Sequence, residues 1–156
     1  MLCPRHYVVR VASLFGAAGA SGKGGNFVET MVKKARAGEP VRVVDDIRMS
    51  PTYTKDAAYL IREILLNDYP YGVYHATNAG SCSWYEFAAE IFAQLGLQVD
   101  LAPISRSALA QKAQRPRDSS LASSRLQGLA VRPWEEALRA YLAEKGYLGS
   151  AESNDP

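Results

Sequence analysis

The sequence has little cysteine, no long apolar run and no signal peptide. Cys3 and Cys82 are its only cysteines. Their spacing fits no metal motif, and two are too few for a disulfide framework, so both are expected to be reduced. The apolar runs are far too short to span a bilayer, and no basic-apolar-small leader opens the chain. These absences predict a cytoplasmic protein with no membrane partner and no metal.

The charges also form no block of one sign. Eighteen basic and sixteen acidic side chains give a net charge of +2. This balance does not itself exclude an anionic partner, but no basic run marks a nucleic-acid surface, so no nucleic-acid partner is expected. An apolar content of 47% over 156 residues is ordinary for one globular domain. We expect one α/β domain over residues 1–149 and a flexible tail over residues 150–156.

Strand and helix patterns alternate along the chain. A buried strand is expected over residues 7–12, further strands over residues 41–44 and 72–76, and a strand or extended segment over residues 99–104. Helices are expected to begin at Asn26 (paired with Glu29), at Thr52 or Thr54, at the S-x-x-E capping box from Ser83, and at Pro133, with a short helical turn over residues 121–127. This order predicts an α/β fold with mainly parallel strands and flanking helices.

The loop over residues 45–56 follows the expected strand 41–44. It holds two carboxylates, an arginine, hydroxyls and the Tyr53 ring, and Pro51 stiffens it. Loops at the carboxyl ends of parallel strands are where open sheets bind ligands. A polar connection with a helix cap is the simpler interpretation of the loop alone. Asp45 and Asp46 have no metal spacing and are interpreted as structuring the loop.

Two catalytic patterns are rejected. Gly16, Gly19 and Gly22 imitate a dinucleotide fingerprint, but residues 23–25 intervene before a helix can begin and seat a pyrophosphate. Tyr141 and Lys145 spell Tyr-x-x-x-Lys, but Tyr141 falls on the expected apolar stripe of the last helix. A packing tyrosine is the better interpretation.

A series of blocks carries a resemblance. They are residues 9–16, 25–31, 44–46, 50–54, 56–58, 72–75 and 83–88, then Arg115-Pro116 with Ser119 and Leu121. In this order they resemble the carboxyl-terminal half of dTDP-4-dehydrorhamnose reductase and its sugar-nucleotide relatives, which are extended short-chain dehydrogenases. The resemblance covers nearly all of residues 7–145.

The resemblance implies a partial Rossmann-like, NAD(P)-binding sheet plus a substrate-binding lobe. NADPH is the hydride donor of that family, and its glycine fingerprint and Tyr-x-x-x-Lys both precede the strand that corresponds to residues 7–12. Neither motif has a place in this chain, so no catalytic residue is assigned. Val11-Ala12-Ser13 stand where many relatives have Thr-Ser-Trp, so an aromatic contact to the sugar is absent or supplied elsewhere.

The resemblance also implies site residues. Leu14 and Phe15 would border the cofactor, and Arg115 would grip a diphosphate with two parallel hydrogen bonds. The other implied substrate contacts are Ser13, Asn26, Phe27, Ser50, Pro51, Thr52, Tyr53 and Ser119. Asn26 is equally a plain helix cap, and Arg115 is otherwise a surface arginine.

The function implied is binding of a dTDP-4-keto sugar for NADPH-dependent reduction at C4 in dTDP-rhamnose biosynthesis, by a chain that is not active alone. A missing cofactor-binding half or a homodimer would complete it. The alternative is a non-catalytic regulatory subunit of the same fold. A nucleotide site in the glycine loop is a third, weaker hypothesis.

Overall fold

Short strand pairs and four helices make up the computed structural model, which describes residues 3–18, 25–108, 116–126 and 128–148. The strands are β1 (Tyr7–Arg10), β2 (Leu14–Phe15), β3 (Val41–Val44), β4 (Arg48–Met49), β5 (Thr52–Tyr53), β6 (Gly72–His75), β7 (Cys82–Ser83) and β8 (Leu101–Ile104). The helices are α1 (Phe27–Arg36), α2 (Thr54–Leu66), α3 (Trp84–Gln94) and α4 (Trp134–Glu144), with a 3₁₀ turn at Arg106–Ala108.

Three of the four strand pairs are parallel. β1 pairs with β6, β2 with β5, and β3 with β8, while β4 and β7 are antiparallel. The expected α/β fold with mainly parallel strands and flanking helices is therefore confirmed. The strands form separate two-stranded sheets, however, because bends and short loops interrupt the ladders between β1 and β2 and between β3 and β5.

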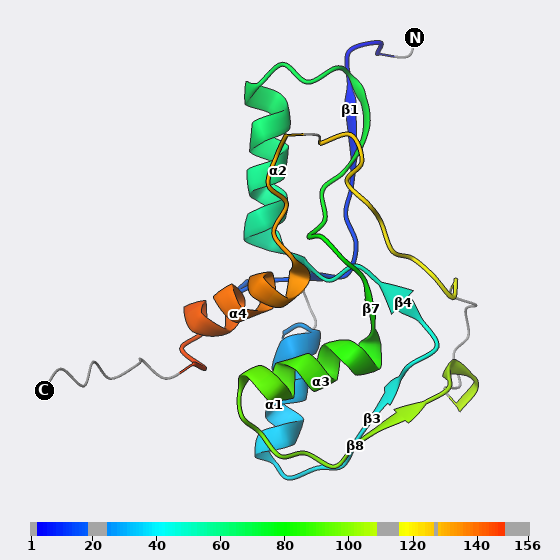
Figure 1. Ribbon diagram of the computed structural model, residues 1–156, viewed down its shortest axis with the longest axis vertical. Helices are drawn as coiled ribbons and strands as arrows, with labels where there is room; N and C mark the ends of the chain where they lie inside the picture. The colour runs from blue at the N-terminus through cyan, green and yellow to red at the C-terminus, as the bar shows by residue number, and fades with distance from the viewer. Residues whose placement is uncertain (1–2, 19–24, 109–115, 127, 149–156) are drawn as a thin grey trace, which may run out of the picture.

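The larger core lies where α1, α3 and α4 meet β3 and the β2–β5 pair (Figure 1). Phe15, Phe87 and Tyr141 interlock there, with the ring of Phe15 5.6 Å from that of Phe87 and 5.5 Å from that of Tyr141. A smaller core lies between α2 and the β1–β6 pair around Leu60, Ile64 and Tyr74.

Two of the predicted helix starts are confirmed in detail. Asn26 caps α1 by accepting the Glu29 N–H, and Ser83 with Glu86 forms the capping box of α3. The Glu29 side chain does not return to the cap, because it instead accepts hydrogen bonds from Tyr141 and Tyr147.

Other expectations of local structure were wrong. No hydroxyl caps α2: Tyr53 is its N-cap, and the Asn78 side chain accepts the Tyr53 N–H. β1 ends at Arg10, and its side chains alternate between half-buried and exposed, so it is not a buried strand. The described part of residues 121–127 forms a turn at 124–125 and no helix, because residues 120–123 lie extended against Ser50 and β6.

The expected tail over residues 150–156 lies outside the described residues. None of the helices in the described ranges is long and apolar enough to cross a membrane.

Candidate functional site

The loop after β3 is fixed by its two carboxylates. Asp45 accepts a hydrogen bond from the Ser83 hydroxyl at 2.6 Å. Asp46 accepts from the Arg106 N–H at 2.7 Å and from the Ser105 hydroxyl at 2.8 Å. The backbone bond from Arg106 is the main cause that lowers the pKa of Asp46. Both carboxylates therefore structure the loop, as expected.

Residues 50–53 are hydrogen-bonded to two segments that are distant in the sequence. Ser50 Oγ accepts the Leu121 N–H at 3.0 Å and donates to the Leu121 carbonyl at 3.2 Å. The Thr52 N–H donates to the Ser13 carbonyl at 3.2 Å. Ser50 and Thr52 are fully buried, so their hydroxyls face protein and form the floor of this region.

Tyr53 is the aromatic residue of the loop, and it is buried. Its ring stacks on Phe15 with centroids 5.7 Å apart, and its hydroxyl donates to the Glu144 carboxylate. Burial raises its pKa, and Glu144 adds to this effect, so the phenol stays protonated. Its exposed fraction is only 3%, and its contacts are with core residues.

The other residues implied by the resemblance lie nearby but do not form one surface. Ser13 is at a positive φ of 41°, which turns the chain between β1 and β2, so that Leu14 is exposed while Phe15 is buried. The Asn26 side-chain amide donates to the Gly16 carbonyl and to Tyr141 Oη, at 3.0 and 2.9 Å. The Phe27 ring packs on Trp84, with centroids 4.8 Å apart.

Ser119 and Pro51 complete the set that the structure describes. Ser119 donates from both its N–H and its hydroxyl to the Arg48 carbonyl, at 3.0 and 3.2 Å. Pro51 is buried beside Ser50. Arg115 lies outside the described residues. The roles of all these residues toward a sugar nucleotide stay predictions.

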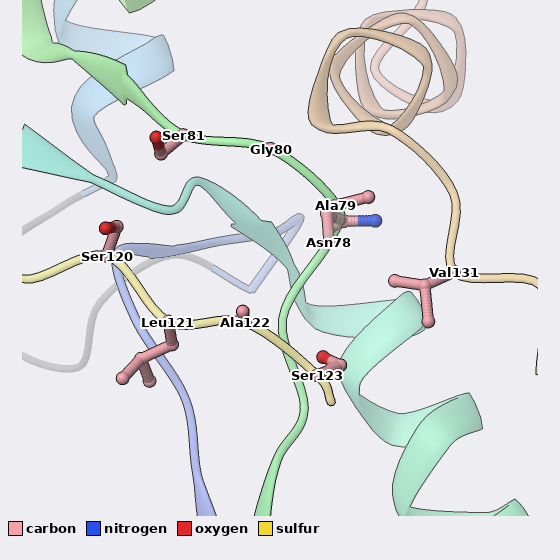
Figure 2. A pocket seen from close by; sticks show the side chains of 9 residues that line it. All are labelled: Asn78, Ala79, Gly80, Ser81, Ser120, Leu121, Ala122, Ser123 and Val131. Atoms are coloured by element: carbon pink, nitrogen blue, oxygen red, sulfur yellow. The ribbon is translucent and has the colours of Figure 1, made fainter. Parts of the chain in front are cut away.

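A pocket of about 500 Å³ is lined in part by Leu121, to which Ser50 is hydrogen-bonded. Figure 2 shows its two walls, one formed by residues 78–81 after β6 and the other by residues 120–123, with Val131 at one side. Ser81, Ser120 and Ser123 contribute hydroxyls, and Leu121 and Val131 contribute apolar surface. Such a mixture suits a polyhydroxylated ligand with an apolar face.

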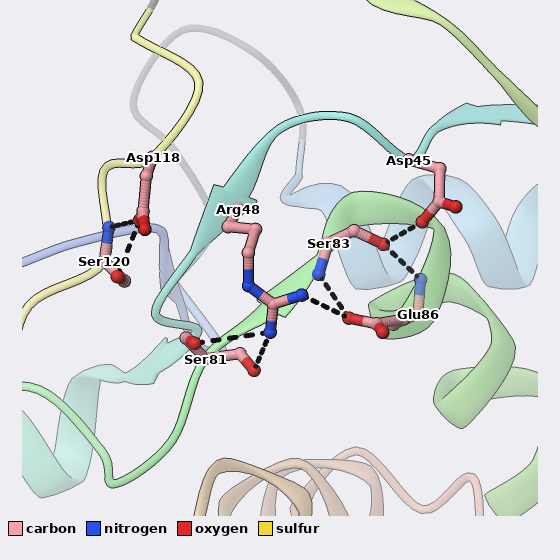
Figure 3. Close-up of polar contacts among 7 residues, drawn as sticks. All are labelled: Asp45, Arg48, Ser81, Ser83, Glu86, Asp118 and Ser120. Carbon is pink, nitrogen blue, oxygen red and sulfur yellow. Dashed lines mark hydrogen bonds and ion pairs between the residues drawn. The ribbon is translucent and has the colours of Figure 1, made fainter.

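Arg48 contacts the first wall of this pocket through its side chain (Figure 3). Its guanidinium donates to the Ser81 carbonyl at 2.9 Å and forms an ion pair with Glu86 at 3.5 Å. Its backbone N–H donates to the Arg117 carbonyl at 2.8 Å, and its carbonyl accepts from Ser119. Arg48 of β4 is therefore bonded to the first wall through its side chain, and through its backbone to residues 117 and 119, which precede the second wall.

Sequence reasoning missed Asn78, Ser81 and residues 120–123. Asn78 follows a strand that was expected, so its place at the carboxyl end of β6 was available as a signal. Ser120 directly follows the expected contact Ser119, which was a weaker signal. Nothing in the local pattern indicated that residues 120–123 would pair with Ser50, about 70 positions earlier.

The sequence matches the family model described as the RmlD substrate binding domain over residues 1–146. The chain belongs to the RmlD substrate-binding domain family. The resemblance to dTDP-4-dehydrorhamnose reductases is thereby confirmed at the level of the family.

Two relatives illustrate the position of this RmlD-family chain. It is 40% identical over 140 residues to the spore coat polysaccharide biosynthesis protein SpsK of Bacillus subtilis, covering 88% of this chain and 47% of SpsK. It is 38% identical to dTDP-4-dehydrorhamnose reductase of Streptomyces griseus, covering 85% of this chain and 44% of that protein.

Two solved structures of this family are also similar to this chain. A dTDP-4-dehydrorhamnose reductase of Bacillus anthracis in complex with NADP is similar with a TM-score of 0.78 and 37% identity, over 88% of this chain and 48% of that one. An ortholog from Clostridium acetobutylicum gives a TM-score of 0.79 and 34% identity, over 89% and 48%. The chain thus spans about half the length of the relatives that it matches.

The described residues fit the border of a dinucleotide site better than its centre. Leu14 is exposed and free to contact a cofactor. The N-terminus of α1, however, is capped by Asn26, whose side chain accepts the Glu29 N–H that a pyrophosphate would otherwise use. In the same ranges of the chain, no cluster of His, Cys, Asp and Glu could hold a metal ion.

Proposed function

We propose that this chain is the substrate-binding half of a reductase of the dTDP-4-dehydrorhamnose type, and that it binds a dTDP-linked 4-keto sugar. The observation that carries the proposal is the family match over residues 1–146 together with a relative of known activity class at 38% identity. In the whole enzyme, NADPH would deliver a hydride to the C4 carbonyl carbon, as a step of dTDP-rhamnose biosynthesis.

We assign the chain to the carboxyl-terminal half of that enzyme. The order of the matching blocks supports this assignment, and so does the state of the two motifs that catalysis would need. α1 begins only at Phe27, after the glycine loop and its Asn26 cap. Tyr141 is fully buried and hydrogen-bonded to Glu29, so it is not placed to protonate a substrate. The chain is therefore not expected to catalyse reduction alone.

The pocket between residues 78–81 and 120–123 is our candidate for the sugar site. Its serine hydroxyls suit the hydroxyls of a sugar, and the apolar faces of Leu121 and Val131 suit the ring carbons. Ser119 borders the Ser120 wall, and Arg115 lies four positions before it in the sequence. The resemblance implies that Arg115 would grip the diphosphate of the sugar nucleotide.

NADPH would be held mainly by the part of the enzyme that this chain does not match, with the exposed Leu14 at its border and Phe15 buried behind it. Cys3 and Cys82 are both free, which agrees with a cytoplasmic location. A sugar-nucleotide pathway that draws on NADPH also belongs in that compartment.

Calorimetric titration with dTDP-glucose, and separately with NADPH, tests the proposal. We expect binding of the dTDP-sugar and weaker binding of UDP-glucose. Ala122→Phe places a ring at an exposed position of the pocket wall and should weaken dTDP-sugar binding at least tenfold. Ala58→Phe, at an exposed position of α2, is the matched control and should bind as the wild type does.

Three outcomes would count against the proposal. If Ala122→Phe bound the dTDP-sugar as tightly as the wild type does, the pocket would not be the sugar site. If the chain alone bound NADPH, the glycine loop would again be a candidate nucleotide site. If a chain that melts cooperatively bound neither ligand, the alternative of a non-catalytic regulatory subunit would be favoured.

A further inference from the structure

A second pocket, also of about 500 Å³, lies along α1 and shares no lining residue with the pocket between residues 78–81 and 120–123. One of its walls is formed by Glu29, Val32, Lys33 and Arg36 of α1. These positions are three or four residues apart, so their side chains project from one face of the helix. Tyr147, which follows α4, forms the other wall.

The wall formed by Tyr147 is held at two points. Gly146 has a φ of 69°, and the Tyr147 N–H donates to the Leu142 carbonyl at 2.9 Å, which is how a helix that ends in glycine reverses the chain. The Tyr147 hydroxyl then reaches α1 and donates to the Glu29 carboxylate at 2.6 Å. The half-buried ring is therefore fixed in place by its backbone and by its hydroxyl.

Glu29 is the acidic residue in the lining, and its charge is already met inside the protein. One carboxylate oxygen accepts from Tyr141 and the other from Tyr147, and the Lys145 ammonium lies 3.7 Å away. Although Glu29 lies one helical turn before Lys33, its carboxylate pairs with these other groups. The positive charges in the lining are therefore not balanced by Glu29.

Two cations of the pocket have no acidic partner. Lys33 and Arg36 are exposed, and within the described ranges neither has a carboxylate at ion-pair distance. The Arg36 guanidinium lies over the Tyr147 ring, 5.0 Å from its centroid. Stacking on a fixed ring orients the guanidinium plane and leaves the N–H groups at its edge available to a ligand.

The helix dipole alone does not explain this arrangement. Basic residues are favourable in the last turn of any helix, and Lys33, Lys34 and Arg36 all lie in the last turn of α1. Lys34 forms an ion pair with Glu39 and is not among the residues that line the pocket. The two cations that lack an acidic partner are the two that face the pocket.

We propose that this pocket is an anion site that binds the phosphate group of a small phosphorylated metabolite. The phosphate oxygens would accept hydrogen bonds from the edge of the Arg36 guanidinium and from the Lys33 ammonium, since a planar fork beside a point charge suits a doubly charged group. A volume of about 500 Å³ leaves room for an organic part beside Val32. The site lies outside the sugar-nucleotide pocket and does not depend on the proposed function.

Nuclear magnetic resonance titration of the full chain, labelled with ¹⁵N, tests the site. Inorganic phosphate and glucose 1-phosphate are the probes, and glucose is the neutral control. We expect both phosphates, but not glucose, to shift the amide signals of the lining residues Gly25, Thr30 and Tyr147 saturably. Tighter binding of glucose 1-phosphate supports a phosphorylated metabolite, whereas equal binding of the two phosphates would overturn that ligand in favour of free phosphate.

Lys33→Ala with Arg36→Ala should weaken the binding of glucose 1-phosphate by about tenfold or more, because hydrogen bonds from charged donors are lost. Arg36→Lys keeps the charge but not the planar fork, and it should weaken binding about threefold. Both side chains are exposed, so the variants should melt as the wild type does.

Lys34→Ala is the matched control, because it removes a basic residue of the same helical turn that does not line the pocket. It should bind glucose 1-phosphate as the wild type does. Equal weakening by Lys34→Ala and Lys33→Ala would show that only the net charge of α1 matters, and it would overturn the proposal. Amide signals that do not shift, or that shift without saturating, would do the same.

The two pockets can be tested separately. Lys33→Ala with Arg36→Ala should leave the dTDP-glucose titration unchanged, and Ala122→Phe should leave glucose 1-phosphate binding unchanged. Loss of dTDP-glucose binding in the double variant would make this pocket part of the sugar-nucleotide site and overturn a separate anion site. Binding of glucose 1-phosphate by a chain that binds no dTDP-sugar would support the anion site and remove the proposed function.

Discussion

Asn78 accepts the backbone N–H of Tyr53 through its side-chain oxygen, at 2.8 Å, in a fully buried setting. Its amide group donates to the Asp56 carboxylate at 2.6 Å and to the Arg132 carbonyl at 3.1 Å. One side chain therefore anchors the backbone of Tyr53, the residue before α2, and joins it to the segment before α4.

Asn78→Ala should lower the free energy of unfolding by about 2–4 kcal/mol, since it leaves several buried polar groups without a partner at about 1–3 kcal/mol each. Urea denaturation measures this change. Asn67→Ala, at the exposed end of α2, should change stability by less than about 1 kcal/mol. Equal losses of stability at the two positions would contradict the anchoring role of Asn78.

Glu29 should make stability depend on pH. Burial raises the pKa of its carboxyl, but hydrogen bonds from Tyr141 and Tyr147 and the charge of Lys145 outweigh this, so the pKa is lowered. A carboxyl with a lowered folded pKa stabilises the protein above its ordinary pKa of about 4.3, and this contribution disappears as the pH falls through the folded value.

Glu29→Gln should therefore cost about 1–3 kcal/mol at pH 7 and progressively less as the pH falls below about 4.3. Urea denaturation at pH 7 and at pH 3 measures the difference. Glu39→Gln, in an exposed ion pair with Lys34, is the control and should cost less than about 1 kcal/mol at either pH. A pH-independent effect at Glu29 would show that its charge does not matter.

Arg48 should matter for the pocket more than for the fold. Arg48→Ala keeps the backbone bonds to Arg117 and Ser119 but removes the guanidinium bond to Ser81. Under the proposed function, we expect dTDP-glucose affinity to fall about tenfold, which corresponds to about 1.4 kcal/mol.

The control for Arg48 is Arg42→Ala, which removes an exposed arginine bound to Asp100 on the β3–β8 pair. Its affinity for dTDP-glucose should match the wild type. Arg48→Lys should restore little, because one ammonium group cannot reproduce the planar, forked set of donors. Titration calorimetry measures these affinities. Unchanged dTDP-glucose affinity in Arg48→Ala would mean that the Ser81 wall keeps its position without the guanidinium.

Gly16 should tolerate no side chain. A Cβ built there would overlap Thr54 Oγ1 and lie 3.0 Å from Thr54 Cγ2. Gly16→Ala should therefore cost about 1–3 kcal/mol of stability. Thr54→Ala in the same molecule removes the overlapping atoms and should recover part of the loss, which a double-mutant cycle in urea measures.

The sequence was sufficient for elements that local chemistry decides. Ser83 and Glu86 satisfy each other three residues apart, so the start of α3 was predictable, as was the apolar stripe that buries Tyr141. The start of α2 was not, because its N-cap residue Tyr53 has no capping side chain and is held through its backbone N–H by Asn78, 25 residues later in the chain.

The candidate site was predictable only in part, for the same reason. The loop after β3 was recognised, but the Ser50 hydroxyl bonds to Leu121 and the Thr52 hydroxyl donates to the Ser50 carbonyl. Both hydroxyls face inward, and only tertiary contacts decide which way a loop hydroxyl points. The walls of the pocket were missed because residues 120–123 have no periodicity of their own and take their extended shape from β6 and Ser50.

The bond between Ser50 and Leu121 spans 71 residues. During synthesis, the loop after β3 and the strand β6 emerge well before residues 120–123, so the pocket has only one wall until late in translation. Closing so long a loop costs entropy before any contact is gained, which makes non-local pairing slow. Binding competence should accordingly be among the last properties that the folding chain acquires, and a ligand present during refolding should act on the final step.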